Sequence, residues 1–66
     1  MIKIVKNDMQ EVVMLPVVDN KTGKYRLVNI AIRSILTREF KNLDEIKAYL
    51  TGLLDDKKIK SLWFSN

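Results

Sequence analysis

Residues 12–28 have the sequence VVMLPVVDNKTGKYRLV, and this stretch holds the strongest local signal for the fold. Its first seven residues are apolar and rich in valine, which is typical of a strand covered on both faces. The Asp-Asn pair at 19–20 favours a type I turn, and Gly23 supplies the left-handed residue of a bulged hairpin. The stretch therefore predicts two antiparallel strands, at 10–18 and 24–28, joined by a tight turn.

Pro16 and residues 2–6 add to this β-rich beginning of the chain. Proline has no N–H, so we expect the strand at 10–18 to lie at a sheet edge near Pro16, or to stop pairing there. Isoleucines at positions 2 and 4 alternate with a lysine, which predicts a further strand over 2–6. The Asn-Asp pair at 7–8 then offers a turn. This part of the chain therefore predicts a short antiparallel sheet.

Residues 29–40 fit two different structures. As a strand they are interrupted by Ser34, and their apolar side chains fall on both faces. As a helix they form one apolar stripe in which only Ile30 is a misfit. The stripe consists of Val28, Ala31, Ile32, Ile35, Leu36 and Phe40. The β-branched residues favour a strand, but the helical period accounts for more of the pattern and predicts a helix over 29–40.

Residues 43–55 predict a second helix. Asn42 is a good N-cap, and Glu45 stands where a capping box places its second partner. The apolar stripe that follows is Leu43, Ile46, Tyr49, Leu50, Leu53 and Leu54. Gly52 lies inside this helix, which we interpret as close packing against a neighbouring backbone. Residues 59–64 then predict a closing strand, although some of them also fit one face of a helix.

These elements predict a single small α+β domain over residues 1–66. A chain of 66 residues buries only about 60% of its unfolded surface, so it supports one core. It has no cysteine and no histidine, which excludes disulfides, thiolate zinc sites and histidine general bases. Its carboxylates are isolated or stand in adjacent pairs, and adjacent residues on a helix do not face each other. We therefore expect a protein that is not an enzyme, with no catalytic residue, cofactor or metal site.

Hydropathy bears on where the protein works. Proline left aside, the longest unbroken apolar runs are four residues at 12–15 and three at 62–64, far short of the roughly 20 residues that cross a bilayer. The first residues do not contain the long apolar segment of a signal peptide. We therefore expect a cytoplasmic protein with no membrane partner.

The apolar content points to a protein partner. Apolar residues make up 47% of the chain, which is more than a small domain encloses. The valine-rich strand is the expected place for the excess, which gives Val13, Leu15 and Val17 as candidate partner-binding residues. The covering chain is either a second copy, forming a homodimer, or another protein that pairs with the strand edge. Trp63, in contrast, is interpreted as a plug that closes the core.

The function predicted from these observations is a non-enzymatic, self-associating protein-binding module that occupies a partner's surface. Nine lysines and seven isoleucines, with little alanine, glycine or proline, are typical of an AT-rich genome. Small proteins from such genomes, phage genomes among them, are often regulators or inhibitors of larger proteins. No small-molecule ligand is inferred.

A basic stretch supports an alternative function, nucleic-acid binding. The net charge is +4, and residues 20–38 contain five cations and no acid. The candidate nucleic-acid-binding residues are Lys21, Lys24, Tyr25, Arg26, Arg33 and Arg38. Arginine pairs well with phosphate, and an aromatic ring between two cations is an arrangement found in single-strand binders. A solvated surface, with Tyr25 in a cross-strand pair, explains the same residues without a ligand.

Overall fold

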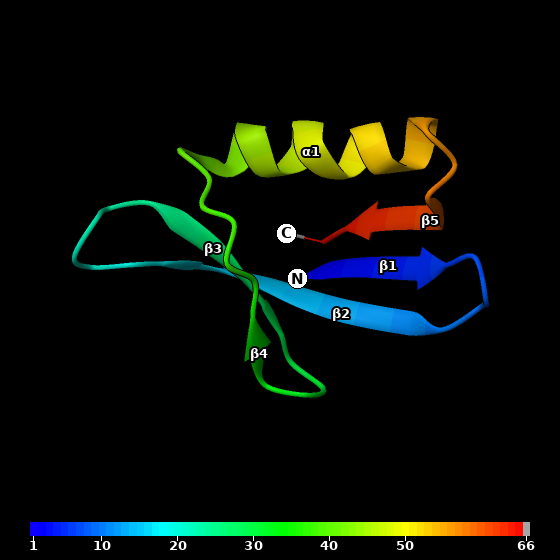
Figure 1. Ribbon diagram of the computed structural model, residues 1–66, viewed down its shortest axis with the longest axis horizontal. Helices are drawn as coiled ribbons and strands as arrows, with labels where there is room; N and C mark the ends of the chain where they lie inside the picture. Colours follow the sequence, from blue (N-terminus) through cyan, green and yellow to red (C-terminus); the bar gives the residue numbers. More distant parts are fainter. Residues whose placement is uncertain (66) are drawn as a thin grey trace.

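The computed structural model describes residues 1–65, which form a five-stranded antiparallel sheet and one helix (Figure 1). The strand order is β4-β3-β2-β1-β5. The elements are β1 (Ile2–Lys6), β2 (Glu11–Val18), β3 (Tyr25–Asn29), β4 (Ser34–Ile35), α1 (Leu43–Asp55) and β5 (Ile59–Phe64). The predicted α+β class is confirmed, and so is the strand predicted over residues 59–64.

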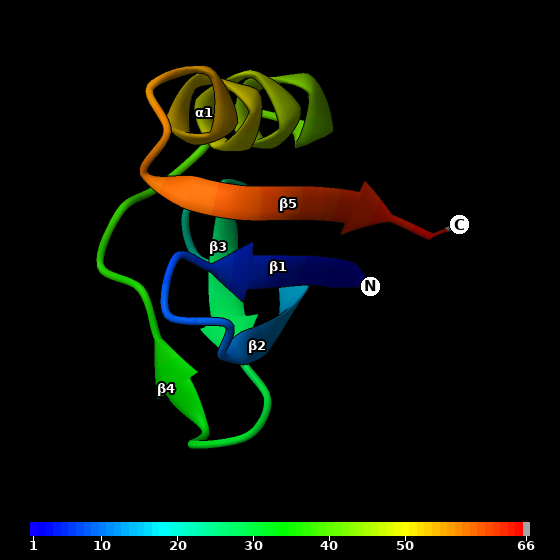
Figure 2. The same cartoon turned by 90° about the vertical axis from the view of Figure 1, so that its right-hand side faces the viewer.

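The first and last strands are neighbours in the sheet. Strands β1 to β4 follow one another as an antiparallel meander, and α1 then carries the chain back so that β5 pairs with β1 (Figures 1 and 2). Ile2 pairs with Phe64, and the Ser65 N–H donates to the Met1 carbonyl at 3.0 Å. Strand β1 therefore lies inside the sheet, between β2 and β5.

The turn between β2 and β3 has the geometry that its sequence predicts. Gly23 has a φ of 71°, the left-handed region that glycine enters at little cost. Its N–H donates to the Asp19 carbonyl at 2.7 Å, and the Asp19 N–H donates to the Lys24 carbonyl at 2.8 Å. The Asp19 side chain also accepts from the Lys21 N–H at 2.9 Å. The predicted left-handed glycine is confirmed.

Pro16 lies where β2 loses one of its two neighbours. Strand β1 begins at Ile2, which pairs with Met14, so the part of β2 beyond Met14 pairs with β3 alone. Pro16 pairs with Leu27, whose carbonyl accepts from the Leu36 N–H on the far side of β3 at 2.9 Å. In an antiparallel ladder, opposed residues form either a hydrogen-bonded or a non-hydrogen-bonded pair. Leu27 directs its carbonyl to Leu36, so Pro16 and Leu27 form a non-hydrogen-bonded pair and the Pro16 nitrogen points away from β3. The expected end of pairing at the proline is confirmed on the β1 side.

The helix predicted over residues 29–40 is wrong. Residues 30–33 form a turn, β4 follows it, and the chain then runs without regular structure to Phe40. The Asn29 side chain accepts from the Ala31 N–H at 3.1 Å, a local bond that competes with helix formation. Arg33 has a φ of 53°, which no α-helix allows. Of the three isoleucines of this segment, Ile35 lies in β4, and Ile30 and Ile32 lie in the turn.

Phe40 ties the end of this segment to the rest of the domain. It forms a bridge with Tyr25, in which each N–H donates to the other residue's carbonyl at 2.8 Å. Its side chain is buried, and its ring centroid lies 5.5 Å from that of Tyr49 on α1. Of the apolar stripe predicted for a helix over 29–40, Phe40 alone is buried.

The helix predicted over residues 43–55 is confirmed as α1. The Asn42 side chain caps it, accepting from the Glu45 N–H at 2.9 Å. Lys57 ends it with a φ of 59° and donates its N–H to the Leu54 carbonyl at 3.0 Å, as in a Schellman motif. A Cβ added at Gly52 would meet no atom within 4 Å. The close packing inferred at Gly52 is therefore wrong.

The core lies between α1 and one face of the sheet. Its eight buried apolar residues are Ile2, Ile4, Met14, Leu27, Phe40, Ile46, Leu50 and Ile59. Five of these come from β1, β2, β3 and β5, at positions that point to the same side of the sheet. The other side of the sheet faces away from the helix.

Candidate protein-interaction surface

The strand register gathers apolar side chains on the sheet face opposite α1. Lys3 pairs with Val13 on one side and with Trp63 on the other. Leu15 pairs with Val28, which in turn pairs with Ile35. Because side chains alternate along a strand, the neighbours of the buried core residues point to this opposite face. We call it the open sheet face, defined by Val13, Leu15, Val17, Val28, Ile35 and Trp63.

Three members of the open sheet face are strongly exposed. The exposed fractions are 41% for Leu15 and 57% for both Ile35 and Trp63. Val13, Val17 and Val28 are half-buried between them. Single exposed apolar residues are common on soluble proteins, but here Leu15, Val28 and Ile35 are direct neighbours across three strands, and only Lys3 separates Val13 from Trp63. Neighbouring apolar residues of this kind are typical of an interaction surface.

The core plug predicted at Trp63 is wrong. In β5 the alternation turns Leu62 and Phe64 toward the core and leaves Trp63 on the open sheet face. Phe64 packs against the core cluster and receives the Lys47 ammonium 5.8 Å from its ring centroid. A strand of alternating exposure therefore puts the largest aromatic residue of the chain where a partner can reach it.

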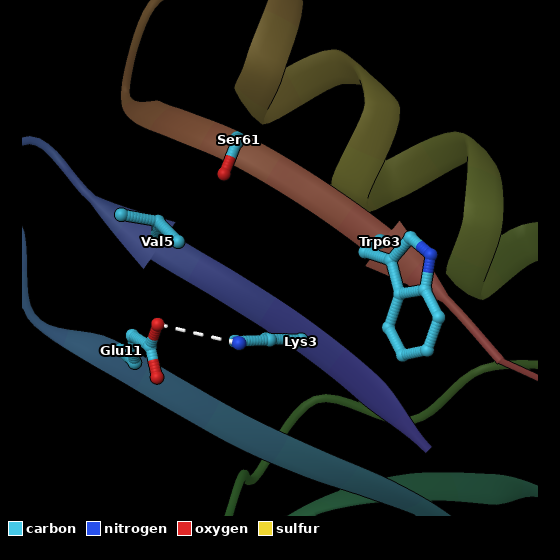
Figure 3. A pocket seen from close by; sticks show the side chains of 5 residues that line it. All are labelled: Lys3, Val5, Glu11, Ser61 and Trp63. Atoms are coloured by element: carbon cyan, nitrogen blue, oxygen red, sulfur yellow. Dashed lines mark ion pairs between the residues drawn. The ribbon is translucent and has the colours of Figure 1, made fainter.

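A cavity of about 340 Å³ lies at the Trp63 end of the open sheet face. Its lining residues are Lys3, Val5, Glu11, Ser61 and Trp63 (Figure 3). The Lys3 Nζ lies 3.3 Å from Glu11 Oε1, an ion pair between β1 and β2. The cavity is thus bounded by an indole ring and an ion pair.

A second group of charges lies at the opposite end of this face. Arg26 contacts Asp19 at 3.7 Å and Glu39 at 3.5 Å, and all three side chains are about one third exposed or less. Partly exposed ion pairs of this kind add about 1 kcal/mol or less to stability. The apolar residues of β2 and β3 on the open sheet face therefore lie between two charged groups, as in an interface whose apolar centre has a polar rim, whereas Trp63 lies on β5 on the far side of Lys3.

The structure brings the predicted partner-binding residues together. Val13, Leu15 and Val17 lie at alternate positions of β2 and so on the same face. Val13 lies between β1 and β3, whereas Leu15 and Val17 lie in the part of β2 that pairs with β3 alone and has a free edge on the β1 side. Sequence analysis missed Val28, Ile35 and Trp63. The alternation within 59–64 is the signal that could have identified Trp63.

The predicted nucleic-acid-binding residues are spread over the molecule. Lys21 and Lys24 lie in the turn that precedes β3, and Arg33 lies in the turn that follows it. These two turns are at opposite ends of β3 in Figure 1. The remaining three residues of this set have contacts within the protein.

These three residues are Tyr25, Arg26 and Arg38. Tyr25 is half-buried, pairs with Val18 across the hairpin and packs against the core cluster. Arg26 holds the two carboxylates at the end of the open sheet face. The Arg38 guanidinium carbon lies 4.5 Å from the Tyr49 ring centroid, in a cation–π contact. The cross-strand role considered for Tyr25 is thus confirmed.

Comparison with protein-family models, curated proteins and solved structures finds no match for this chain. Within residues 1–65, no three acidic side chains gather closely enough to hold a metal ion. The single helix of the described chain is too short and too polar to cross a membrane.

Proposed function

We propose that this protein is a non-enzymatic protein-binding module that acts through its open sheet face, by self-association or by covering the surface of another protein. The observation that carries the proposal is the uncovered apolar face of the sheet. Helix α1 covers one side only, and Leu15, Ile35 and Trp63 remain exposed on the other. A small regulatory or inhibitor protein would act in this way.

The energetics of burial support this proposal. Removing apolar surface from water gains about 25 cal/mol per Å², and full burial of one large side chain gains about 1.5–3 kcal/mol. Tryptophan is enriched among the residues that dominate binding energy, and such residues lie in an apolar centre surrounded by polar groups. Leu15 has this position between the two charged ends, and Trp63 lies beside one of them, on the edge strand β5 next to Lys3.

The chemistry of the chain also favours binding over catalysis. The sequence contains neither histidine nor cysteine, so a general base or nucleophile would have to come from carboxylate, lysine, tyrosine or hydroxyl groups. The cavity beside Trp63 contains one lysine and one carboxylate, and these two groups pair with each other. This arrangement provides a polar rim for a protein interface.

A photo-cross-linking experiment tests the proposal. A benzophenone amino acid replaces Trp63 in one variant and Met9, in the β1–β2 turn, in a control. Both positions are exposed, but only Trp63 belongs to the open sheet face. On irradiation of the cells that make the protein, we expect a discrete protein adduct from position 63 and none from position 9. Equal adducts at both positions, or none at either, would contradict the proposal.

A further inference from the structure

We propose that the free edge of β2 binds a short extended segment of another protein, which adds a strand beside residues 16–18 and places one apolar side chain in a cavity next to Pro16. The direction of the backbone polar groups in this part of β2 and the apolar cavity beside them carry the inference. This edge is a different surface from the open sheet face, so the inference goes beyond the proposed function.

The second half of β2 has one free edge. Strand β1 pairs with β2 only as far as Ile2 opposite Met14, and none of residues 1–65 pairs with residues 16–18 on that side. In Figure 1 this part of β2 runs past the start of β1 toward the β2–β3 turn. An edge of this kind presents unpaired backbone groups to which another strand can bind.

The backbone polar groups of Pro16 and Val18 point toward the free edge. Val18 pairs with Tyr25, whose N–H and carbonyl both bond to Phe40 on the far side of β3. Because opposed residues in such a pair turn their groups away from each other, the Val18 N–H and carbonyl lie at the free edge, as the Pro16 carbonyl does. A helix cannot bond to these groups along its length, since its own N–H and carbonyl groups pair internally. The edge therefore selects an extended chain.

A cavity of about 220 Å³ lies beside this edge, on the side of the sheet that α1 covers. Its lining is mainly apolar and includes Pro16 on β2, Leu43 and Ile46 on α1, and Phe64 on β5. Opposed residues of neighbouring strands direct their side chains to the same face, so the side chain opposite Pro16 in an added strand enters the cavity. The volume is about seven times the roughly 30 Å³ that one water occupies in the liquid, which is room for one large apolar side chain.

Two exposed apolar residues border the same site. Leu43 is 46% exposed and Val18 is 50% exposed. Val18 lies at an even position of β2, like the buried Met14, and so points away from the open sheet face. An added strand would cover Val18, and its side chain in the cavity would cover Leu43. The proposed occupant therefore accounts for exposed apolar surface that the open sheet face does not include.

Pro16 favours a segment of another protein over a second copy of β2. Proline has a carbonyl but no N–H, so it can accept one bond at this edge and donate none. If residues 16–18 of two copies paired antiparallel, each Pro16 would oppose a Val18 and leave that Val18 carbonyl without a donor. A segment of another protein can bond to both Val18 groups and to the Pro16 carbonyl. The short length of the edge also limits the occupant to a short segment.

A peptide titration of the isotope-labelled full chain, followed by nuclear magnetic resonance, tests the inference. The probes are acetyl-Thr-Thr-Val-Thr-X-amide peptides in which X is Ala, Val, Leu, Met or Phe. Antiparallel pairing sets the valine opposite Val18 and X opposite Pro16. We expect a saturable shift of the Val18 amide signal, with a Kd at least ~tenfold lower for Leu or Phe at X than for Ala. Methylation of the peptide nitrogen at X removes the donor for Pro16 and should raise the Kd by ~fivefold or more.

A change at position 18 tests the backbone bonds. Val18→Pro removes the donor at the free edge and should raise the Kd for the best peptide by ~fivefold or more. The fold should be kept, because the Val18 N–H does not pair with β3. Val18→Thr keeps the donor and should leave the Kd within about twofold. Circular dichroism melts of both variants measure whether the domain stays folded.

A change at position 43 tests the cavity. Leu43→Glu places a carboxylate in the apolar lining and should raise the Kd by ~tenfold or more, while glutamate suits the first turn of a helix. Ile32→Glu makes the same kind of change at an exposed residue of the β3–β4 turn and should leave the Kd within about twofold.

Three results would overturn the inference. One is no saturable shift below ~1 mM from any of the peptides, and another is binding that both Val18→Pro and Leu43→Glu leave unchanged. The third is a set of shifts confined to Leu15, Ile35 and Trp63, which would put the peptide on the open sheet face instead. The cross-linking from position 63 is independent of these results, so the proposed function and this inference can fail separately.

Discussion

Two regions of this small domain use apolar residues in different ways. In the region formed by α1, β5, β1 and the first half of β2, each element turns one side toward the core, and apolar side chains on that side are buried. In the outer segment, residues 30–39, every residue is exposed, including Ile32 at 71% and Ile35 at 57%. The two regions have similar apolar residues. Hydrophobic pattern alone therefore does not distinguish a core from a surface that another chain can cover.

The largest expected effect comes from a charge placed in each region. Leu50→Asp should unfold the chain, because Leu50 is 2% exposed and an unpaired buried charge costs several kcal/mol against a total stability of about 5 kcal/mol. Ile35→Asp makes a matching change in the outer segment and should leave the fold intact. Thermal melts followed by circular dichroism measure both. A cooperative melt of the Leu50 variant near the parent temperature would remove the distinction between the regions.

The turn between β2 and β3 lies between the two regions along the chain and gives the next effect. Gly23→Val should lower the free energy of unfolding by more than ~1 kcal/mol, because a β-branched residue is a poor fit at positive φ. A Cβ at this position meets no atom within 4 Å, so the cost comes from the backbone alone. Gly23→Asn is the control and should cost less, since asparagine tolerates this conformation. Urea unfolding with equal midpoints for all three proteins would contradict this account.

A stabilising change of similar or smaller size is expected within α1. Gly52→Ala should raise the free energy of unfolding by about 1 kcal/mol, because alanine is the better helix former and the added Cβ has free space. The same urea measurement detects this as a higher midpoint with an unchanged slope. A loss of stability would mean that the helix packs more closely at this position than the contacts indicate.

The smallest effect is expected for nucleic acid, and it tests whether the arginines of β3 and the outer segment bind phosphate. Affinity for short DNA or RNA should be near the ~10⁻⁴ M of non-specific attraction and should vanish at moderate salt. Changing Arg26, Arg33 and Arg38 together to glutamine should flatten the salt slope only slightly, because Arg26 and Arg38 already have partners within the protein. Fluorescence anisotropy measures both quantities. Sub-micromolar binding that resists salt would favour the nucleic-acid function instead.

Local sequence signals predicted the parts of the fold in which a single residue determines the backbone conformation or hydrogen bonding next to it. Asn42 caps α1, Gly23 takes the left-handed conformation, and Pro16 marks where β2 loses a neighbour. Each of these roles depends on the residue's own chemistry and needs no knowledge of the rest of the fold. Such signals were sufficient for most strand positions and for one helix.

Residues 29–40 were assigned wrongly because the helical period was given more weight than the β-branched residues, and Trp63 because the alternation within 59–64 was not applied to it. The bridge between Phe40 and Tyr25 and the pairing of Val28 with Ile35 are contacts that no local period reveals. The candidate residues Val13, Leu15 and Val17 were found together because they share one strand. Ile35 and Trp63 join them only through the register of neighbouring strands, which tertiary pairing sets.

The pairing of β1 with β5 also affects how the domain is made during synthesis. Ile2 and Phe64 are partners, so β1 has one of its two neighbours missing until the last strand has been synthesised. At ordinary synthesis rates of ~5–20 residues per second, that interval is roughly 3–12 seconds. The β1–β2 hairpin meanwhile exposes its inward isoleucines beside an unpaired strand edge, a state open to misassociation. Contacts so distant in sequence also slow folding relative to a bundle of similar size. Pairing with β5 therefore removes the free edge of β1.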